Sequence, residues 1–184
     1  MAYDTSDKQT MQVLVDAVPI IRPSGTASPE FMVKMDDILS SFNKYGDGKF
    51  AELLWFHSVE ERVTAGHSGG GLRGTSTINH SLVVLHLLAD NWTPVLRQKM
   101  RSGDNIKNIQ VVRLMNLGEG SENLDTQLIE FTDSKIDRIE EFPDRIIVSI
   151  RVKTRKDVII KVGQTGKTLG QKASDWNYAT AKTL

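Results

Sequence analysis

Short apolar segments separated by polar turns dominate the chain from Phe31 onward, and this spacing predicts β-strands rather than helices. We expect strands at residues 31–35, 49–57, 75–88, 106–115, 126–133, 134–142, 145–153 and 157–162. Within the segment 145–153, every second residue from Ile146 onward is Ile or Val, whereas the residues between them include Ser149 and Arg151. This alternation is typical of a strand with two unlike faces.

One helix is predicted between two groups of strands. Thr93 is the expected N-cap, Pro94 occupies the first helical position, and Gly103 ends the helix. Because the helix does not alternate with strands, the pattern disfavours a doubly wound parallel sheet. About eight strands with a single helix instead favour a closed or sandwiched β-barrel.

Residues 59–74 form a long, glycine-rich segment between two predicted strands. Long loops without structure of their own are uncommon in compact domains and often bind partners. Two interpretations stay open: a loop without fixed structure, or an arm that becomes ordered against a neighbouring subunit, where glycines allow close backbone approach. Residues 1–29 carry apolar positions broken by Pro19, Pro23 and Pro29, and we interpret them as an N-terminal arm.

Composition narrows the class of protein. The 184 residues are enough for one domain, and 23 basic residues balance 23 acidic ones, which gives no reason to expect nucleic acid or an anionic membrane as partner. The absence of cysteine excludes disulfides, thiolate catalysis and Cys-based zinc sites. No apolar run approaches the roughly 20 residues that span a bilayer. The polar start lacks a signal-peptide pattern, so we expect a cytosolic protein whose export would need a route other than general secretion.

The sequence GQTGKTLG at 163–170 resembles the end of a phosphate-binding loop, because Gly166, Lys167 and Thr168 match its G-K-T. However, Lys161 stands where that motif requires a glycine five residues earlier, and no helix signal follows. We therefore expect a polar C-terminal loop here. A nucleotide-binding enzyme that uses this segment is the less favoured hypothesis.

The remaining chemically capable residues do not form a convincing site. The four histidines are His57, His67, His80 and His86. His80 and His86 would share a strand face, but about 20 Å apart at 3.3 Å per residue, which is too far to bind one metal. We interpret the histidines as ordinary surface or interface residues. Carboxylates adjacent in a strand, such as Glu140 and Glu141, point to opposite faces, so we expect solvated or ion-paired roles for them.

Several weak motifs follow one another in a specific order and spacing. They are FMVKMDDI at 31–38, LWF at 54–56, the glycines Gly69, Gly70, Gly71 and Gly74, the helix start with Asp90, Thr93 and Pro94, GDNIKNI at 103–109, and ASDWN at 173–177. Together they resemble the haemolysin-coregulated protein (Hcp) family, the tube proteins of bacterial type VI secretion systems, over residues 31–177. The chain departs from that family at Leu85–Leu87, where Phe-Thr-Lys is usual, and at Asn91, where Lys is common. These departures affect subunit contacts and cargo preference more than the fold.

The resemblance implies a mainly β fold: a β-barrel of two packed antiparallel sheets flanked by one short α-helix, assembling as a hexameric ring. Residues 1–29 would be an arm or extension, and 30–184 the barrel domain with the loop 59–74 and a C-terminal tail at 163–184. Rings would stack through that loop. The residues expected in this contact are Val63, Gly66, His67, Gly69, Gly70, Gly71 and Arg73.

The function that the resemblance implies is structural. The chain would be a subunit of a tube that a contractile sheath expels and that carries effector proteins, with sheath, spike and baseplate proteins as partners. We expect no enzymatic activity, catalytic residue, cofactor, metal, bound nucleic acid or membrane insertion. The protein would be cytoplasmic before firing and then secreted without a signal peptide. The alternative is a tail-tube protein of a contractile phage or phage-like particle.

Overall fold

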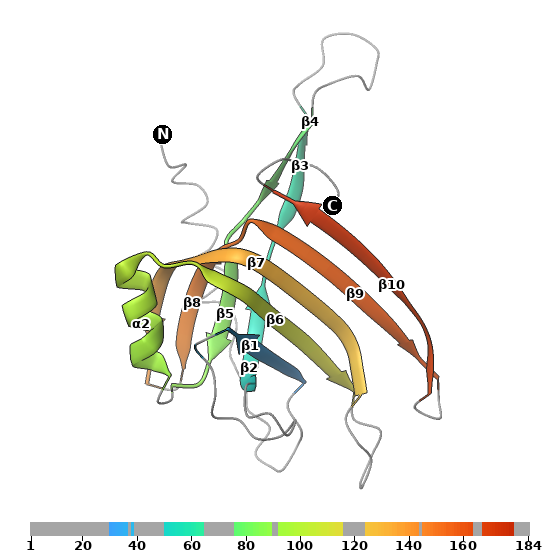
Figure 1. Ribbon diagram of the computed structural model, residues 1–184, viewed down its shortest axis with the longest axis horizontal. Helices are drawn as coiled ribbons and strands as arrows, with labels where there is room; N and C mark the ends of the chain where they lie inside the picture. The colour runs from blue at the N-terminus through green and yellow to red at the C-terminus, as the bar shows by residue number, and fades with distance from the viewer. Residues whose placement is uncertain are drawn as a thin grey trace, which may run out of the picture.

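The computed structural model describes residues 30–36, 38, 50–64, 76–89, 92–115, 124–143, 145–163 and 167–178, with only the backbone at 61–64 and 76–79. This part of the chain holds ten strands and one helix (Figure 1). The elements are β1 (Phe31–Met35), β2 (Phe50–His57), β3 (Glu60–Thr64), β4 (Ser76–His80), β5 (Val83–Leu87), α2 (Thr93–Ser102), β6 (Ile106–Met115), β7 (Leu124–Glu141), β8 (Ile146–Arg151), β9 (Thr154–Val162) and β10 (Thr168–Asn177).

Six strands close into a barrel. Their order is β7-β6-β1-β2-β5-β8, every neighbouring pair is antiparallel, and β8 pairs back onto β7. Closure removes the free edges that an open sheet of these apolar strands would expose. The predicted barrel is therefore confirmed.

The 18-residue strand β7 joins the barrel to a second part of the sheet. One edge of β7 pairs with β6, while its other edge pairs first with β9, through 127–132, and then with β8, through 135–141. Asp133 lies at the change of partner and has a φ of 50°, in the left-handed region. The prediction of two separate strands at 126–133 and 134–142 is wrong, because the backbone turns at Asp133 without leaving the ladder.

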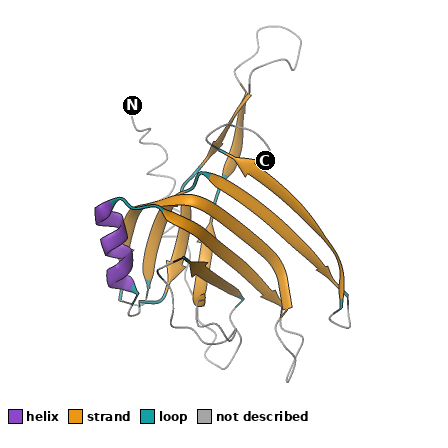
Figure 2. Ribbon diagram, in the orientation of Figure 1, coloured by secondary structure: helices purple, strands orange, loops and turns teal. Residues whose placement is uncertain are grey.

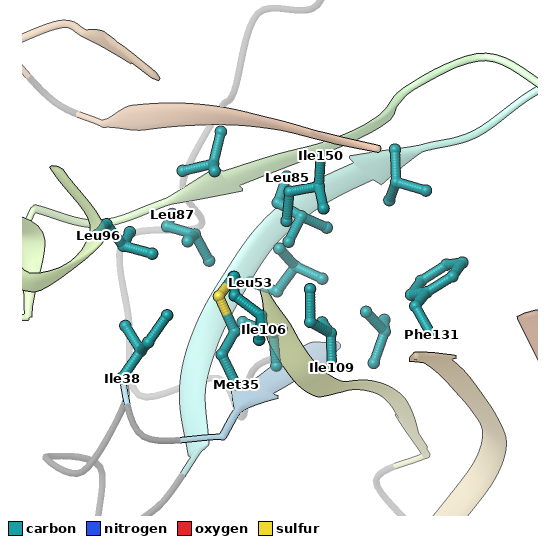
Figure 3. Packing of buried hydrophobic residues seen from close by; sticks show 14 of the residues in the cluster. Met35, Ile38, Leu53, Leu85, Leu87, Leu96, Ile106, Ile109, Phe131 and Ile150 are labelled. Carbon is teal, nitrogen blue, oxygen red and sulfur yellow. The ribbon is translucent and has the colours of Figure 1, made fainter. Parts of the chain in front are cut away.

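The interior of the barrel is filled by one cluster of buried apolar side chains (Figure 3). Among its members are Met35, Ile38, Leu53, Leu85, Leu87, Leu96, Ile106, Ile109, Phe131 and Ile150. Leu96 comes from α2, which packs against β7 and flanks the barrel. Full burial of one such side chain is worth about 1.5–3 kcal/mol, so this cluster is the main source of stability.

Strand β8 is buried on both faces. Ile146 and Val148 belong to the interior cluster, whereas Ile147 packs in a second cluster with Val84 and Phe142. Ser149 is also buried, and only Arg151 among the strand's residues is exposed. The two faces of β8 contact different neighbours, as the alternation predicted. The polar residues Ser149 and Arg151, however, do not mark a face of the strand that is open to solvent.

The helix begins and ends as its sequence signals indicate, with one correction. Trp92 is the N-cap and makes no side-chain capping hydrogen bond, so the prediction of Thr93 as N-cap is wrong, while Pro94 lies in the first turn as predicted. Gly103 is the C-cap, with a φ of 70°, and its N–H donates to the carbonyl oxygens of Lys99 at 3.0 Å and Met100 at 3.3 Å. A left-handed residue at this position favours glycine.

Two extensions project from the barrel (Figure 2). The first, the hairpin β3–β4, is a separate two-stranded sheet. The expected strand at 75–88 is in fact two strands, β4 and β5, and β3 lies inside the segment 59–74 that was expected to be a loop. The second extension, the wing, consists of β9 and β10, which continue the sheet beyond β7. A strand at Thr168–Asn177 therefore occupies the predicted tail.

Candidate assembly surfaces

The outer edge of the wing is formed by β10. Within the described residues, β10 pairs with β9 only, so its other edge has no strand partner. The strand is exposed from Thr168 to Ser174 and becomes half-buried only at its end. Unpaired strand edges present rows of free N–H and C=O groups, which makes them ready sites for strand addition.

The tip of the wing is also apolar and basic. Ile159 and Leu169 are 58% and 61% exposed, the two highest values among the exposed large apolar side chains of the described part. Between residues 158 and 174 the charged side chains are Lys161, Lys167 and Lys172, with no carboxylate. Exposed apolar side chains on a positively charged edge favour contact with a partner surface that covers the apolar groups and complements the charge.

Three carboxylates in the C-terminal part of β7 are held in ion pairs on the barrel. Asp137 accepts a hydrogen bond of 2.6 Å from Arg151, Glu140 lies 3.0 Å from Arg138, and Glu141 pairs with Arg97 of α2. Glu140 and Glu141 thus serve different partners, which confirms their predicted ion-paired role.

The glycine-rich segment predicted to contact a neighbouring ring is only partly within the described residues. Val63 lies on β3, with its backbone opposite Thr77 of β4. The other expected contact residues, Gly66, His67, Gly69, Gly70, Gly71 and Arg73, lie outside the described residues, as does Asp90. The structure adds one fact that the sequence did not suggest: a regular hairpin leads to this segment.

His86 is a buried histidine rather than the surface residue that the sequence analysis expected. Its side chain is fully buried, and neither ring nitrogen has a hydrogen-bond partner among the described residues. The Trp55 ring meets it edge-on, with ring centroids 4.9 Å apart. Burial, the Arg145 guanidinium and His57 together lower the pKa of His86 to about 4. The described residues contain no group of three or more side chains that could hold a metal.

The described residues of the segment 163–170, which are Gly163 and 167–170, do not form a phosphate-binding helix. Lys167 and Thr168 lead into β10, and the N–H of Gly163 donates to the carbonyl oxygen of Lys167 at 2.9 Å. This bond closes the turn between β9 and β10. Phosphate loops place the amides of a helix start around the ligand, and the residues described here place a strand there instead. From Thr168 onward the expected polar loop is therefore a strand, while 164–166 lie outside the described residues.

No protein-family model and no curated protein matches the sequence. Solved structures do match. A type six secretion system protein aligns with a TM-score of 0.74 and 16% identity, covering 85% of this chain and 100% of that one. Hcp1 from Salmonella typhimurium aligns with a TM-score of 0.65 and 17% identity, and the alignment covers 84% of this chain and 97% of that one. A type VI secretion system effector from Yersinia pestis aligns with a TM-score of 0.56 and 17% identity, and the alignment covers 80% of this chain and 98% of that one.

These alignments include nearly the full length of each solved chain, so they concern the whole barrel and not a shared fragment. The chain has a fold of type VI secretion proteins. More narrowly, its fold is that of the Hcp proteins, so the fold that the sequence resemblance implied is confirmed. No helix in the described residues has the length and apolarity needed to cross a bilayer.

Proposed function

We propose that this protein is a structural subunit of the inner tube of a type VI secretion system. Hexameric rings of the chain stack into a tube, a contractile sheath expels the tube, and effector proteins travel in its lumen. The observation that carries the proposal is the Hcp fold over most of the chain, together with an exposed edge at β10 that no other described strand pairs with. Such a subunit needs shape and contacts rather than an active site.

Ring closure requires two different surfaces on each subunit. One surface must fit the other on the next subunit, at an angle that closes the ring after six subunits. The wing supplies one of them. Its free β10 edge offers backbone hydrogen bonds, while Ile159 and Leu169 offer apolar area that contact with a neighbour would bury. In a ring, each wing would extend the sheet of one subunit toward the next.

Ring stacking uses the hairpin β3–β4 and the segment 66–71 at its end. Figure 1 shows the hairpin projecting away from the barrel, where a second ring could receive it. The contacts would come from Val63, Gly66, His67, Gly69, Gly70, Gly71 and Arg73.

The protein would act with sheath, spike and baseplate proteins. It would be made in the cytoplasm and leave the cell inside the apparatus.

Light scattering coupled to size-exclusion chromatography tests the oligomeric state. One chain has a mass of 20.5 kDa, so a ring of six is expected at about 120 kDa, and native mass spectrometry should give the same stoichiometry. A mass of one chain at all concentrations up to the millimolar range would refute the proposal.

A further inference from the structure

A group of side chains ties the base of the hairpin β3–β4 to the wing. We call it the hairpin clamp; it consists of Glu60 on β3, His80 on β4, Arg155 and Asp157 on β9, and Tyr178 after β10. Glu60 and Tyr178 are 118 residues apart in the sequence. Figure 1 shows the end of β10 beside the base of the hairpin.

Arg155 is the centre of the clamp. Its Nε and Nη2 donate to the two carboxylate oxygens of Asp157, at 2.7 and 2.9 Å, and its Nη1 donates to Ser58 Oγ at 2.9 Å. Nη1 also lies 3.5 Å from Glu60 Oε1. The side chain is only 18% exposed, and the guanidinium lies 5.9 Å from the Phe131 ring centroid. A planar guanidinium held by a bidentate carboxylate of the same strand has little freedom relative to β9, so the position of the wing sets where Arg155 places its charge beside the hairpin.

Tyr178 supplies the second connection. Its hydroxyl donates to Glu60 Oε1, and its backbone N–H donates to the carbonyl oxygen of Lys153 at 2.9 Å. Its ring packs against the His80 ring, with the two ring centroids 3.8 Å apart. The clamp therefore contacts both strands of the hairpin. Burial, with Glu60, raises the pKa of Tyr178, and burial lowers the pKa of His80.

The hairpin depends on the clamp because no other strand supports it in the described part of the chain. The β2–β5 ladder ends at His57 opposite Val84, and the β3–β4 ladder begins only at Glu60 opposite His80. Between the two ladders, Val59 and Ser81 are joined by an N–H to carbonyl bond of 2.8 Å and an N–H to Oγ bond of 2.9 Å. A two-stranded hairpin on its own is marginally stable, so side-chain contacts at its base determine its direction.

We infer that the hairpin clamp couples ring stacking to ring closure. This inference rests on the proposed function, in which the wing meets the next subunit in the ring and the hairpin reaches the next ring. A wing held by a neighbour fixes Arg155 and Tyr178, and these residues then fix the hairpin in the direction that stacking needs. In a free subunit the wing is less constrained, and the hairpin samples more directions. Closed rings therefore stack better than open or single subunits.

Two conservative variants test the coupling. Tyr178→Phe keeps the ring against His80 and removes the hydroxyl bond, while Glu60→Gln removes the charge that faces Arg155. Glu30→Gln is the matched control, because Glu30 makes an exposed ion pair of 2.8 Å with Arg113 on the barrel and is not one of the clamp residues. Amide hydrogen exchange of the dilute proteins measures the hairpin directly, and sedimentation velocity at high concentration separates rings from stacked rings.

In both clamp variants we expect about two- to tenfold faster exchange at 60–64 and 76–80, because Tyr178→Phe loses one hydrogen bond and Glu60→Gln loses one charged contact, and unchanged exchange in β7. Rings should form as in the wild type, with a smaller stacked fraction; Glu30→Gln should match the wild type in both measurements. Unchanged hairpin exchange would overturn the clamp. Faster exchange with wild-type stacking, or loss of rings together with stacks, would overturn the coupling. If the wild type forms no rings, the proposed function fails, and the exchange rates still decide whether the clamp holds the hairpin.

Discussion

Protonation of His86 should destabilise the folded protein, and a His86→Phe variant isolates this effect. His86 is fully buried, its ring nitrogens have no hydrogen-bond partners in the part of the chain that the structure describes, and Arg145 and His57 add positive charge nearby. Phe keeps an aromatic ring against Trp55 and cannot take up a proton. His57 and Arg145 remain in both proteins, so their own contributions largely cancel in the comparison.

The pKa of His86 falls from 6.5 in the unfolded chain to about 4 in the fold. The unfolded state therefore binds the proton more readily, and acid favours unfolding. Stability is fully present above pH 6.5 and is lost as the pH falls from 6.5 toward 4. Linkage with these two pKa values gives a loss of about 2 kcal/mol between pH 7 and 5, and about 3 kcal/mol between pH 7 and 4.

Urea unfolding at pH 7 and at pH 5 measures this loss, at protein concentrations where the midpoint does not depend on concentration. We expect the free energy of unfolding of the wild type to fall by about 2 kcal/mol more than that of His86→Phe over this interval. Equal falls in the two proteins would show that His86 takes up its proton in the fold without cost, and the reasoning from burial would be refuted.

Two further changes test the helix end and the stacking segment. Gly103→Ala should lower the free energy of unfolding by about 1 kcal/mol in urea, because a left-handed backbone strains an alanine even though its Cβ would meet no atom within 4 Å; Gly103→Asn should lose less. Deletion of 66–71 should leave the barrel folded by circular dichroism and rings intact by light scattering, but shorten the stacks seen by electron microscopy. Tubes of unchanged length would contradict the role proposed for this segment.

The barrel could be predicted because its strands carry a strong apolar signal. Residues 31–35 and 106–115 were predicted with the bounds that the structure has, since each combines β-branched or large apolar residues with flanking polar turns. The helix was equally clear from Pro94 and Gly103. These local signals agree with the tertiary structure, and that agreement allowed the fold class to be inferred.

The extensions could not be predicted in the same way. Residues 168–174 are exposed and mostly polar, so β10 has no alternating apolar pattern and is defined by its backbone pairing with β9. The segment 60–64 reads as a charged loop because its structure depends on pairing with β4. The contact of Tyr178 with Glu60 joins residues 118 positions apart, and neither residue type signals the other. His86 was misjudged because its burial comes from strands that are distant in the sequence.

Negative-stain electron microscopy of the purified protein tests the central claim most directly, because rings are visible without any assumption about partners. The proposed function predicts rings with sixfold symmetry and, at higher concentration, stacks of such rings. Fields of single globular particles at every concentration, with no rings or tubes, would contradict the account.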